Sequence, residues 1–180
     1  MATEGGSDRG GERTAPPAVK SSPPSRPLSV ERLTHQDVND ITALYKRVWD
    51  GFRPELPTEM VKAWQPTPLE FTSWMEGVTY FAARRDGRMI GAVGCQIQEE
   101  SCRLVHLVVD PETRRQGVAS ALIAAAVEWA AHSKCRSVWV DALARFTAAG
   151  EMFKHLGFEP AGVLHRHRWN EDVMFFEKPL

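Results

Sequence analysis

The stretch that decides the fold is Asp110–Trp129, DPETRRQGVASALIAAAVEW, which follows the apolar run LVHLVV at residues 104–109. The run is typical of a buried strand, and the Ala-rich half of the stretch has high helix propensity. The first N–H groups of a helix lack intrahelical partners and carry partial positive charge, so this junction predicts an anion site. Gly117 lets the backbone approach the anion, while Arg114 and Arg115 add charge that suits a phosphate or pyrophosphate.

The loop sequence excludes two common classes of phosphate site. RRQGVAS, residues 114–120, lacks the Gly-Lys-Ser/Thr of a P-loop, so hydrolysis of nucleoside triphosphates is not expected. It also lacks the GxGxxG pattern of a Rossmann dinucleotide site. The net charge of −1 argues against a dedicated nucleic-acid-binding protein, which would carry a basic bias.

Outside this stretch, strand patterns alternate with helix patterns. Strands are expected at 28–33, 78–85, 89–98, 102–109, 137–143, 158–169 and 172–180, and helices at 34–50, 57–76 (interrupted at Pro66 and Pro68), 118–132 and 145–157. Thr34 and Asp37 form a pair that resembles a capping box, Asp86-Gly87 predicts a hairpin, and Gly157 predicts a helix C-terminal cap. This order predicts a mixed α/β fold with a largely antiparallel first half.

Two stretches resemble the signatures of the GNAT-type N-acetyltransferase superfamily. Arg114-x-x-Gly117-x-Ala119 matches its Q/R-x-x-G-x-G/A motif, and LVVDPETRR is similar to its preceding strand and loop. MFKHLGF, residues 152–158, resembles its second signature, commonly LYEKLGF. The element order from Leu28 to Leu180 is also that of the superfamily. The resemblance implies an α/β (α+β) fold with a mixed, largely antiparallel central sheet of about seven strands and about four flanking helices.

The resemblance implies that acetyl-CoA is the acetyl donor and that an amine of a small molecule or a protein is the acceptor. In the superfamily the loop holds the CoA pyrophosphate through backbone amides, and the preceding strand pairs with the pantetheine arm. On this chain these roles fall to Leu107, Val108 and Val109 of the strand, and to Arg114, Arg115, Gln116, Gly117, Val118, Ala119 and Ser120 of the loop.

The resemblance leaves the catalytic groups open. The tyrosine that often protonates the leaving thiolate corresponds to Phe153 here, so another group or water must act, or the thiolate leaves unassisted. His106 is the candidate general base, because it lies on the strand that should line the acetyl group. Simple alternation places Val105 and Leu107 on one face and His106 on the other, and a bulge frequent in the superfamily would change this. The alternatives are a structural His106, and Glu99–Glu100 acting through water or standing as a solvated turn.

Other residues could shape the acceptor site. Three tryptophans of the early helical region could form an aromatic acceptor wall, or simply pack the core, namely Trp49, Trp64 and Trp74. His165 and His167 should share one face of a strand, opposite Arg166 and Arg168, and could line the acceptor pocket. No third metal ligand stands at a recognisable spacing, so no metal is expected.

The N-terminal segment and the cysteines predict the domain boundary and the cellular location. Met1–Pro27 is rich in Gly, Pro and Ser, so we expect a disordered tail before a domain at 28–180. Three cysteines without a CxxC pair favour reduced thiols, with Cys95 and Cys102 buried in strands. The sequence has no apolar run of about 18 residues and no signal core, so we expect a cytoplasmic protein without a membrane partner.

Three functions remain after these observations. The leading hypothesis is an N-acetyltransferase that uses acetyl-CoA and a primary amine. A non-catalytic module that binds or senses an acyl-CoA is the first alternative, because the usual tyrosine is missing. The second is an interaction protein whose anion site binds nucleic acid or a phosphopeptide, and the charge balance argues against it. Dimers are common in the superfamily, so the resemblance leaves a homodimer open.

Overall fold

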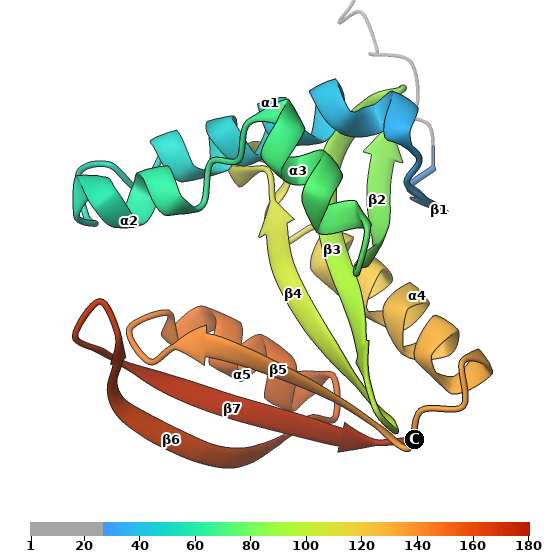
Figure 1. The fold of residues 1–180 in the computed structure, drawn as a ribbon, viewed down its shortest axis with the longest axis vertical. Coiled ribbons are helices and arrows are strands. Elements are labelled where there is room, and N and C mark those ends of the chain that lie inside the picture. The colour runs from blue at the N-terminus through green and yellow to red at the C-terminus, as the bar shows by residue number, and fades with distance from the viewer. Residues whose placement is uncertain (1–26) are drawn as a thin grey trace, which may run out of the picture.

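A seven-stranded sheet, in the order β1-β2-β3-β4-β5-β7-β6, forms the centre of the computed structural model, which describes residues 27–180 (Figure 1). The strands are β1 (Ser29–Arg32), β2 (Thr79–Arg85), β3 (Arg88–Gln98), β4 (Ser101–Val109), β5 (Ser137–Leu143), β6 (Glu159–Arg168) and β7 (Glu171–Pro179). Only the β4–β5 pair is parallel within this sheet. The predicted mixed sheet is confirmed. The predicted disordered tail lies outside the described residues, apart from Pro27.

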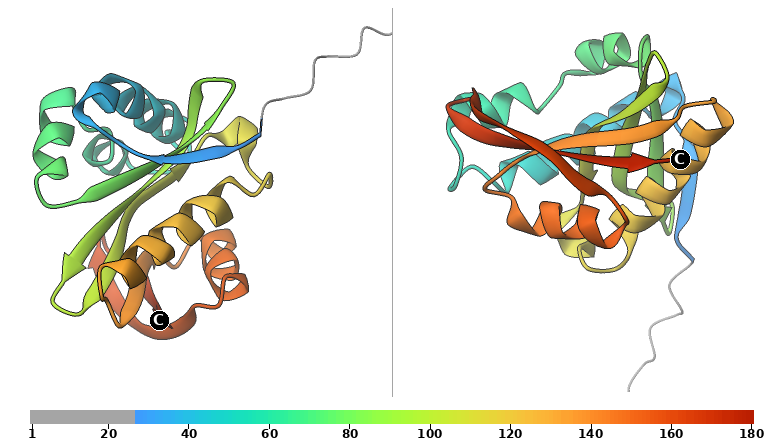
Figure 2. Two further views of the ribbon diagram at one scale, coloured as in Figure 1. Left: turned by 90° about the vertical axis from the view of Figure 1, so that its right-hand side faces the viewer. Right: turned by 90° about the horizontal axis from the view of Figure 1, so that it is seen from below.

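Helices lie on both sides of the sheet (Figure 2). One side carries α1 (Val38–Asp50), α2 (Thr58–Ala63) and α3 (Pro68–Met75), and the other carries α4 (Val118–His132) and α5 (Thr147–His155). These five helices exceed the expected number because the segment 57–76 forms two helices. Pro68 does not interrupt a helix but begins α3, where its fixed φ and missing N–H are compatible with the first turn.

Local signals in the sequence form the expected caps and turn. Thr34 N donates to Asp37 Oδ2 at 2.9 Å, and Gln36 N donates to the Thr34 hydroxyl at 3.3 Å, as in a capping box. Asp86 and Gly87 have φ values of 51° and 78°, as a two-residue type I′ hairpin requires.

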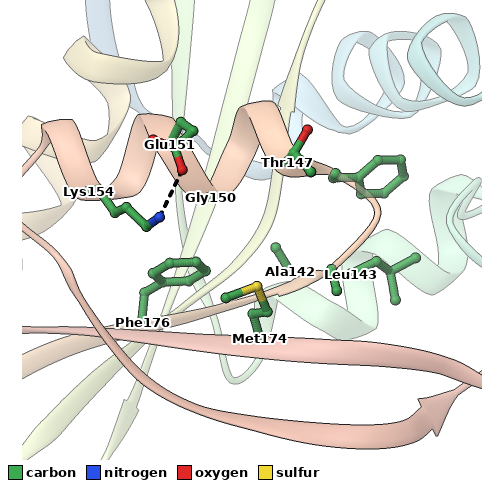
Figure 3. A pocket seen from close by; sticks show the side chains of 10 residues that line it. Ala142, Leu143, Thr147, Gly150, Glu151, Lys154, Met174 and Phe176 are labelled. Atoms are coloured by element: carbon green, nitrogen blue, oxygen red, sulfur yellow. Dashed lines mark hydrogen bonds and ion pairs between the residues drawn. The ribbon is translucent and has the colours of Figure 1, made fainter.

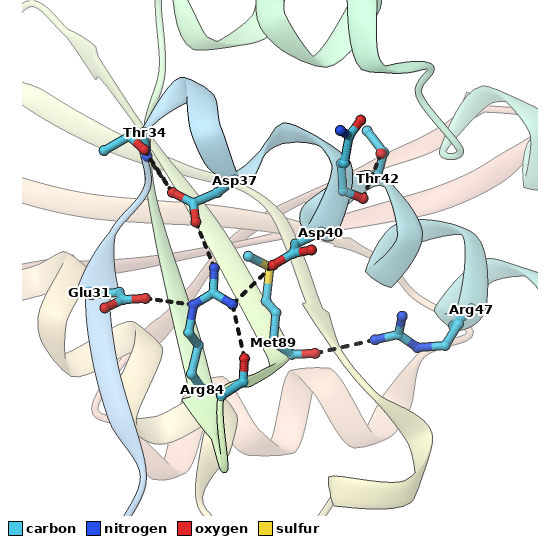
Figure 4. A network of polar contacts seen from close by, with 10 residues as sticks. Glu31, Thr34, Asp37, Asp40, Thr42, Arg47, Arg84 and Met89 are labelled. Atoms are coloured by element: carbon cyan, nitrogen blue, oxygen red, sulfur yellow. Dashed lines mark hydrogen bonds and ion pairs between the residues drawn. The ribbon is translucent and has the colours of Figure 1, made fainter.

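Arg84 of β2 ties the first strand and helix to the sheet (Figure 4). Its guanidinium donates to Glu31 of β1 at 2.6 Å, to Asp37 at 2.7 Å and to Asp40 of α1 at 3.2 Å. The Arg84 side chain is only 15% exposed, so these charge-assisted hydrogen bonds are partly shielded from solvent. The network therefore fixes α1 relative to the β2–β3 hairpin.

The larger core lies between the sheet and helices α4 and α5. At Gly91 of β3, an added Cβ would lie 2.8 Å from Val118 Cγ1 and 3.0 Å from Leu122 Cδ1. The first turn of α4 therefore rests directly on the sheet, which positions the N-terminus of that helix. The core also holds free, buried thiols, as predicted for the first two, at Cys95, Cys102 and Cys135.

Candidate functional site

A bulge in β4 opens the sheet near its centre. Two residues of β4, His106 and Leu107, stand opposite one residue of β3, Val93. His106 has a φ of 55°, in the left-handed region. β4 pairs with β5 only over Ser101–Leu104, and beyond that point the two strands diverge (Figure 1).

The bulge shows that the facing predicted by simple alternation is wrong. Val105 and Tyr80 lie on the same side of Gly94, and His106 contacts the Tyr80 hydroxyl, so Val105 and His106 both face α3. Leu107 instead packs against the core beneath α4. The extra residue shifts the alternation by one position, and the sequence LVHLVV carries no sign of it.

A cavity of about 560 Å³ lies where the strands separate. Trp49 of α1 and Trp74 of α3 line it on one side, and Ala149 and Phe153 of α5 line it on the other. Because these helices lie on opposite sides of the sheet, the cavity passes through the sheet between β4 and β5. Such a passage can admit two molecules from opposite faces.

His106 lies on the wall of this cavity. Its Nδ1 is 2.7 Å from the Tyr80 hydroxyl, and its ring stacks on Trp74 with centroids 4.3 Å apart. The Tyr45 hydroxyl donates to the His106 carbonyl oxygen at 2.5 Å. Burial, followed by the positive charge of Arg103, lowers the pKa of His106 to about 4, so its imidazole is neutral at pH 7. Nε2 has no hydrogen-bond partner within residues 27–180.

The N-terminus of α4 presents free amides beyond the open end of β4. Gly117, with a φ of 78°, is the N-cap, and no side chain caps the helix. Ala121 N donates to Gly117 O at 3.0 Å, while the N–H groups of Val118, Ala119 and Ser120 have no backbone partner in the described chain. No atom lies within 4 Å of the place where a Gly117 Cβ would stand, so an anion has open access.

The side chains of the predicted loop point in different directions, whereas its backbone amides lie together at the N-terminus of α4. The Arg114 guanidinium lies 5.3 Å from the centre of the Phe52 ring, in the loop after α1. Gln116 accepts a hydrogen bond from Arg85. Arg115 is exposed and has a φ of 62°. The structure therefore brings together the predicted backbone groups, whereas Arg114 is directed toward Phe52.

Asp110, which was not predicted to have a role, anchors this loop. Its side chain is 3% exposed and accepts hydrogen bonds from Arg88 at 2.8 Å and Arg47 at 3.3 Å. Its other carboxylate oxygen accepts from Glu112 N at 3.2 Å, in the 3-10 turn at Pro111–Thr113. A buried, doubly paired carboxylate fixes the connection between β4 and α4.

A sequence profile of the acetyltransferase (GNAT) family matches residues 41–158, which contain β4, the α4 N-terminus and α5. The chain belongs to this family. The resemblance found in the sequence motifs is therefore confirmed.

Curated GNAT relatives are N-acetyltransferases of distant organisms. The chain is 26% identical over 143 residues to an uncharacterized N-acetyltransferase of Methanocaldococcus jannaschii, which covers 76% of this chain and 62% of that protein. It is 28% identical over 99 residues to human N-acetyltransferase 8B, which covers 52% of this chain and 44% of that protein. The chain thus spans less than two thirds of the length of both relatives.

Solved GNAT structures share the fold. The ribosomal-protein-S18-alanine N-acetyltransferase of Escherichia coli superposes with a TM-score of 0.70 at 20% identity, over 84% of this chain and 93% of that one. The PaiA N-acetyltransferase of Thermoplasma acidophilum, solved in complex with coenzyme A, gives a TM-score of 0.71 at 14% identity, over 86% of this chain and 100% of that one. At these identities the similarity establishes the fold alone.

In the second GNAT signature, Phe153 is a core residue. It is 2% exposed, and its ring lies 5.8 Å from that of Phe158 and 5.5 Å from that of Phe176. A phenyl ring has no acidic proton, so this position supplies no acid. Glu99–Glu100 lies in the β3–β4 turn, at the far end of β4 from the bulge, where Glu100 pairs with Arg136 at 3.0 Å. Neither glutamate lines the cavity.

An aromatic wall closes one side of the GNAT cleft. Trp49, Trp64 and Trp74 all line the cavity. The rings of Trp49 and Trp64 are 4.3 Å apart, and Trp64 meets Trp169 of the β6–β7 turn at 4.8 Å. The stack joins the α1–α3 side to the β6–β7 hairpin. The tryptophans therefore pack these elements together and also line the cavity.

Three charged residues that line the cavity were not predicted from the sequence, namely Arg103, Asp141 and Arg168. Asp141 accepts hydrogen bonds from Arg103 at 2.7 Å and from Arg168 at 2.9 Å. The available signal was a charge inside each of the apolar runs CRLVHLVV and SVWVDAL, because a charge in a buried strand needs a partner.

His165 and His167, proposed from the sequence as pocket residues, do not line the cavity. Both are exposed, and His165 Nδ1 lies 3.0 Å from an Asp172 oxygen. The register of β6 shifts between Leu164 and Arg168, and Arg168 reaches the cavity instead. Within residues 27–180, no group of three or more His, Cys, Asp or Glu side chains could hold a metal ion. The same part of the chain contains no helix with the length and apolarity needed to cross a membrane.

A second hollow, of about 90 Å³, opens beside α5 (Figure 3). Ala142 and Leu143 of β5 and Phe176 of β7 line it, with the Lys154–Glu151 ion pair of 2.8 Å on the helix. The hollow is much smaller than the cavity between β4 and β5.

Proposed function

We propose that this chain is an acetyl-CoA-dependent N-acetyltransferase, with residues 28–180 as its acetyltransferase domain and a primary amine of a small molecule or a protein as acceptor. The observation that carries the proposal is the passage through the sheet between β4 and β5, which begins at the His106 bulge. The passage offers a thioester donor and an amine separate routes to one point. Family membership and the fold support this assignment.

The donor is placed on the α4 side of the sheet in this proposal. Beyond Leu104, β4 has no β5 partner, so the backbone of residues 107–109 offers strand-edge hydrogen bonds to the pantetheine amides. The N–H groups of residues 118–120 would bind the pyrophosphate at the positive end of the α4 dipole. Arg114 and Arg115 add positive charge around that position.

Transfer requires a neutral amine beside the thioester. The amine nitrogen attacks the carbonyl carbon, the C–S bond breaks, and sulfur leaves with the bonding electron pair. His106 takes the proton from the attacking nitrogen, which becomes far more acidic once the new N–C bond forms. This role requires the tautomer in which Nδ1–H donates to Tyr80, because only then does Nε2 carry a free lone pair.

The leaving group needs no tyrosine in this proposal. A thiol has a pKa of about 8.5, so sulfur is a competent leaving group as a thiolate. The proton taken by His106 then passes to solvent or to the thiolate, which restores the neutral imidazole. Phe153 accordingly serves packing in the core.

A second candidate function is a non-catalytic module that binds an acyl-CoA. Two observations favour it, since Phe153 offers no acid and the low pKa of His106 makes it a weak base. Free thiol released from acetyl-CoA, measured against a panel of amines, separates the two functions. Release that depends on an amine supports the enzyme. CoA binding without release by any amine supports the module, and absence of CoA binding rejects both and revives a nucleic-acid or phosphopeptide site.

We also propose a cytoplasmic location, in line with three buried, unpaired thiols. Subcellular fractionation tests it, and recovery of the protein outside the cytoplasm would contradict it.

A further inference from the structure

Two arginines and one aspartate form a charged cluster on the α3-facing wall of the cavity. Arg103 precedes Val105 by two residues on β4, so both side chains lie on that face. Arg103 Nη2 and Arg168 Nη1 donate to different oxygens of Asp141, at 2.7 and 2.9 Å. The Asp141 side chain is 6% exposed, whereas those of Arg103 and Arg168 are 27% and 33% exposed. The carboxylate is thus enclosed, and the two guanidinium groups border the open space.

Both guanidinium groups keep N–H groups unused. Arg103 Nη1 and Arg168 Nη2 have no hydrogen-bond partner within residues 27–180, and Arg103 Nε is buried without one. Arginine donates hydrogen bonds but cannot accept them. Two cations against one anion also leave a net positive charge on this wall. The complementary ligand group is therefore a singly charged anion rich in acceptor oxygens, which describes a carboxylate.

Much of the remaining wall is apolar, and Ser73 and Gln96 add polar groups to it. The indoles of Trp49 and Trp64 line the same cavity, together with Val105 and Leu143. A ligand that reaches the arginines must lie against these surfaces, so a hydrocarbon or aromatic body is favoured.

The charged cluster lies close enough to His106 for one small molecule to reach both. Arg103 is three residues before His106 on β4, a Cα separation of about 10 Å at roughly 3.3 Å per residue. The long arginine side chain shortens the remaining gap. Arg103, Asp141 and Arg168 line the same cavity as His106.

We propose that the acceptor is a small amine with an apolar body and a free carboxylate, which Arg103 and Arg168 bind while the amine reaches His106. The inference rests on the proposed acetyl transfer and narrows its acceptor to amino-acid-like molecules. An internal peptide segment lacks the free carboxylate and does not complete the cluster.

Matched amines test the carboxylate directly. Phenylalanine is compared with phenethylamine, and 6-aminohexanoate with hexylamine, by thiol release from acetyl-CoA. The parent protein should prefer the carboxylate member of at least one pair by about tenfold or more in kcat/KM. Arg168→Gln should reduce that preference by roughly 10- to 100-fold, mainly through KM, and leave the carboxylate-free amine within about twofold. Arg166→Gln is the matched control, because Arg166 is exposed on the same strand and does not line the cavity.

The outcomes separate this inference from the proposed activity. If the carboxylate-free amines are acetylated equally well and Arg168→Gln changes nothing, the carboxylate site is rejected while acetyl transfer stands. If no amine releases thiol, phenylalanine and 6-aminohexanoate are titrated calorimetrically into the CoA-loaded protein. Binding that weakens about tenfold in Arg168→Gln, but not in Arg166→Gln, supports the site even without turnover. Absence of binding, or equal binding by both variants, overturns it.

Discussion

Replacing Gly91 by alanine should move α4 and with it the predicted CoA-binding amides. The new Cβ would lie 2.8 Å from Val118 Cγ1, 3.0 Å from Leu122 Cδ1 and 3.2 Å from the Val108 carbonyl oxygen. Val118 and Leu122 lie at the start of α4, and the β-branched Val118 has little χ1 freedom in a helix, so relief of its contact shifts the helix outward. Overpacking of this kind costs about 1–3 kcal/mol. The lower entropy of the unfolded alanine chain offsets about 0.4–1 kcal/mol of that.

From the middle of these ranges, the net loss in the free energy of unfolding is about 1.3 kcal/mol, or a fall in Tm of about 3–5 °C for a chain of this size. Urea unfolding measures the first quantity. Calorimetric titration with CoA measures the effect on binding. The Kd for CoA should rise about tenfold if the shift of α4 costs one charge-assisted hydrogen bond. Gly162→Ala is the matched control, because Gly162 is also a strand glycine but has no atom within 4 Å of its Cβ position. Equal stability and equal CoA affinity of the two variants would show that α4 packing does not position the site.

Three further substitutions test other parts of the proposal. Burial lowers the pKa of His106 to about 4, so the kcat/KM of the parent should fall toward pH 4 rather than near pH 6.5. An unchanged rate and pH profile in His106→Ala would show that His106 is not the base. Gly117→Trp should weaken CoA binding at least about tenfold by steric block while the circular dichroism spectrum stays native, and unchanged affinity would contradict the loop assignment. Arg84→Met should lower the free energy of unfolding at pH 7 by about 1–3 kcal/mol. Hydrogen bonds from the Thr34 backbone and hydroxyl, and then Arg84, hold the pKa of Asp37 below its usual value. The stabilisation by Arg84 is therefore present above about pH 4 and is lost as the pH falls further. Urea unfolding of parent and variant at pH 7 and pH 3 should therefore give a smaller difference at pH 3, and an equal or larger one would contradict the role of the network.

Sequence patterns predicted the elements well wherever local preference and packing agree. SVWVDAL coincides with β5, and the Asp86-Gly87 turn joins β2 to β3 as expected. The backbone of the loop before α4 was equally predictable from the sequence. Gly117 has the positive φ that glycine adopts readily, and as the N-cap residue it has no side chain to cap the helix. In these cases a few neighbouring residues determine the backbone, so no knowledge of distant contacts is needed.

The chemistry of the cavity depends on distant contacts and was less predictable. The bulge at His106 depends on pairing with β3 and on contacts from Tyr80, more than 20 residues away in sequence. The charged cluster takes one residue each from β4, β5 and β6, and β6 lies at the far edge of the sheet, beyond β7. Patterns along the chain show that Arg103 and Asp141 need partners, but only the sheet order shows that each partners the other.

The passage between β4 and β5 also has a kinetic consequence. In the proposed function, a donor bound on the α4 side does not need to leave before an acceptor enters from the α3 side, so both substrates would occupy the protein together. The buried thiols lie in the core and line no part of the cavity, so no cysteine is placed to carry the acetyl group. Initial rates measured at several fixed concentrations of one substrate should then give intersecting double-reciprocal lines. Parallel lines would instead indicate a covalent acetyl-protein intermediate.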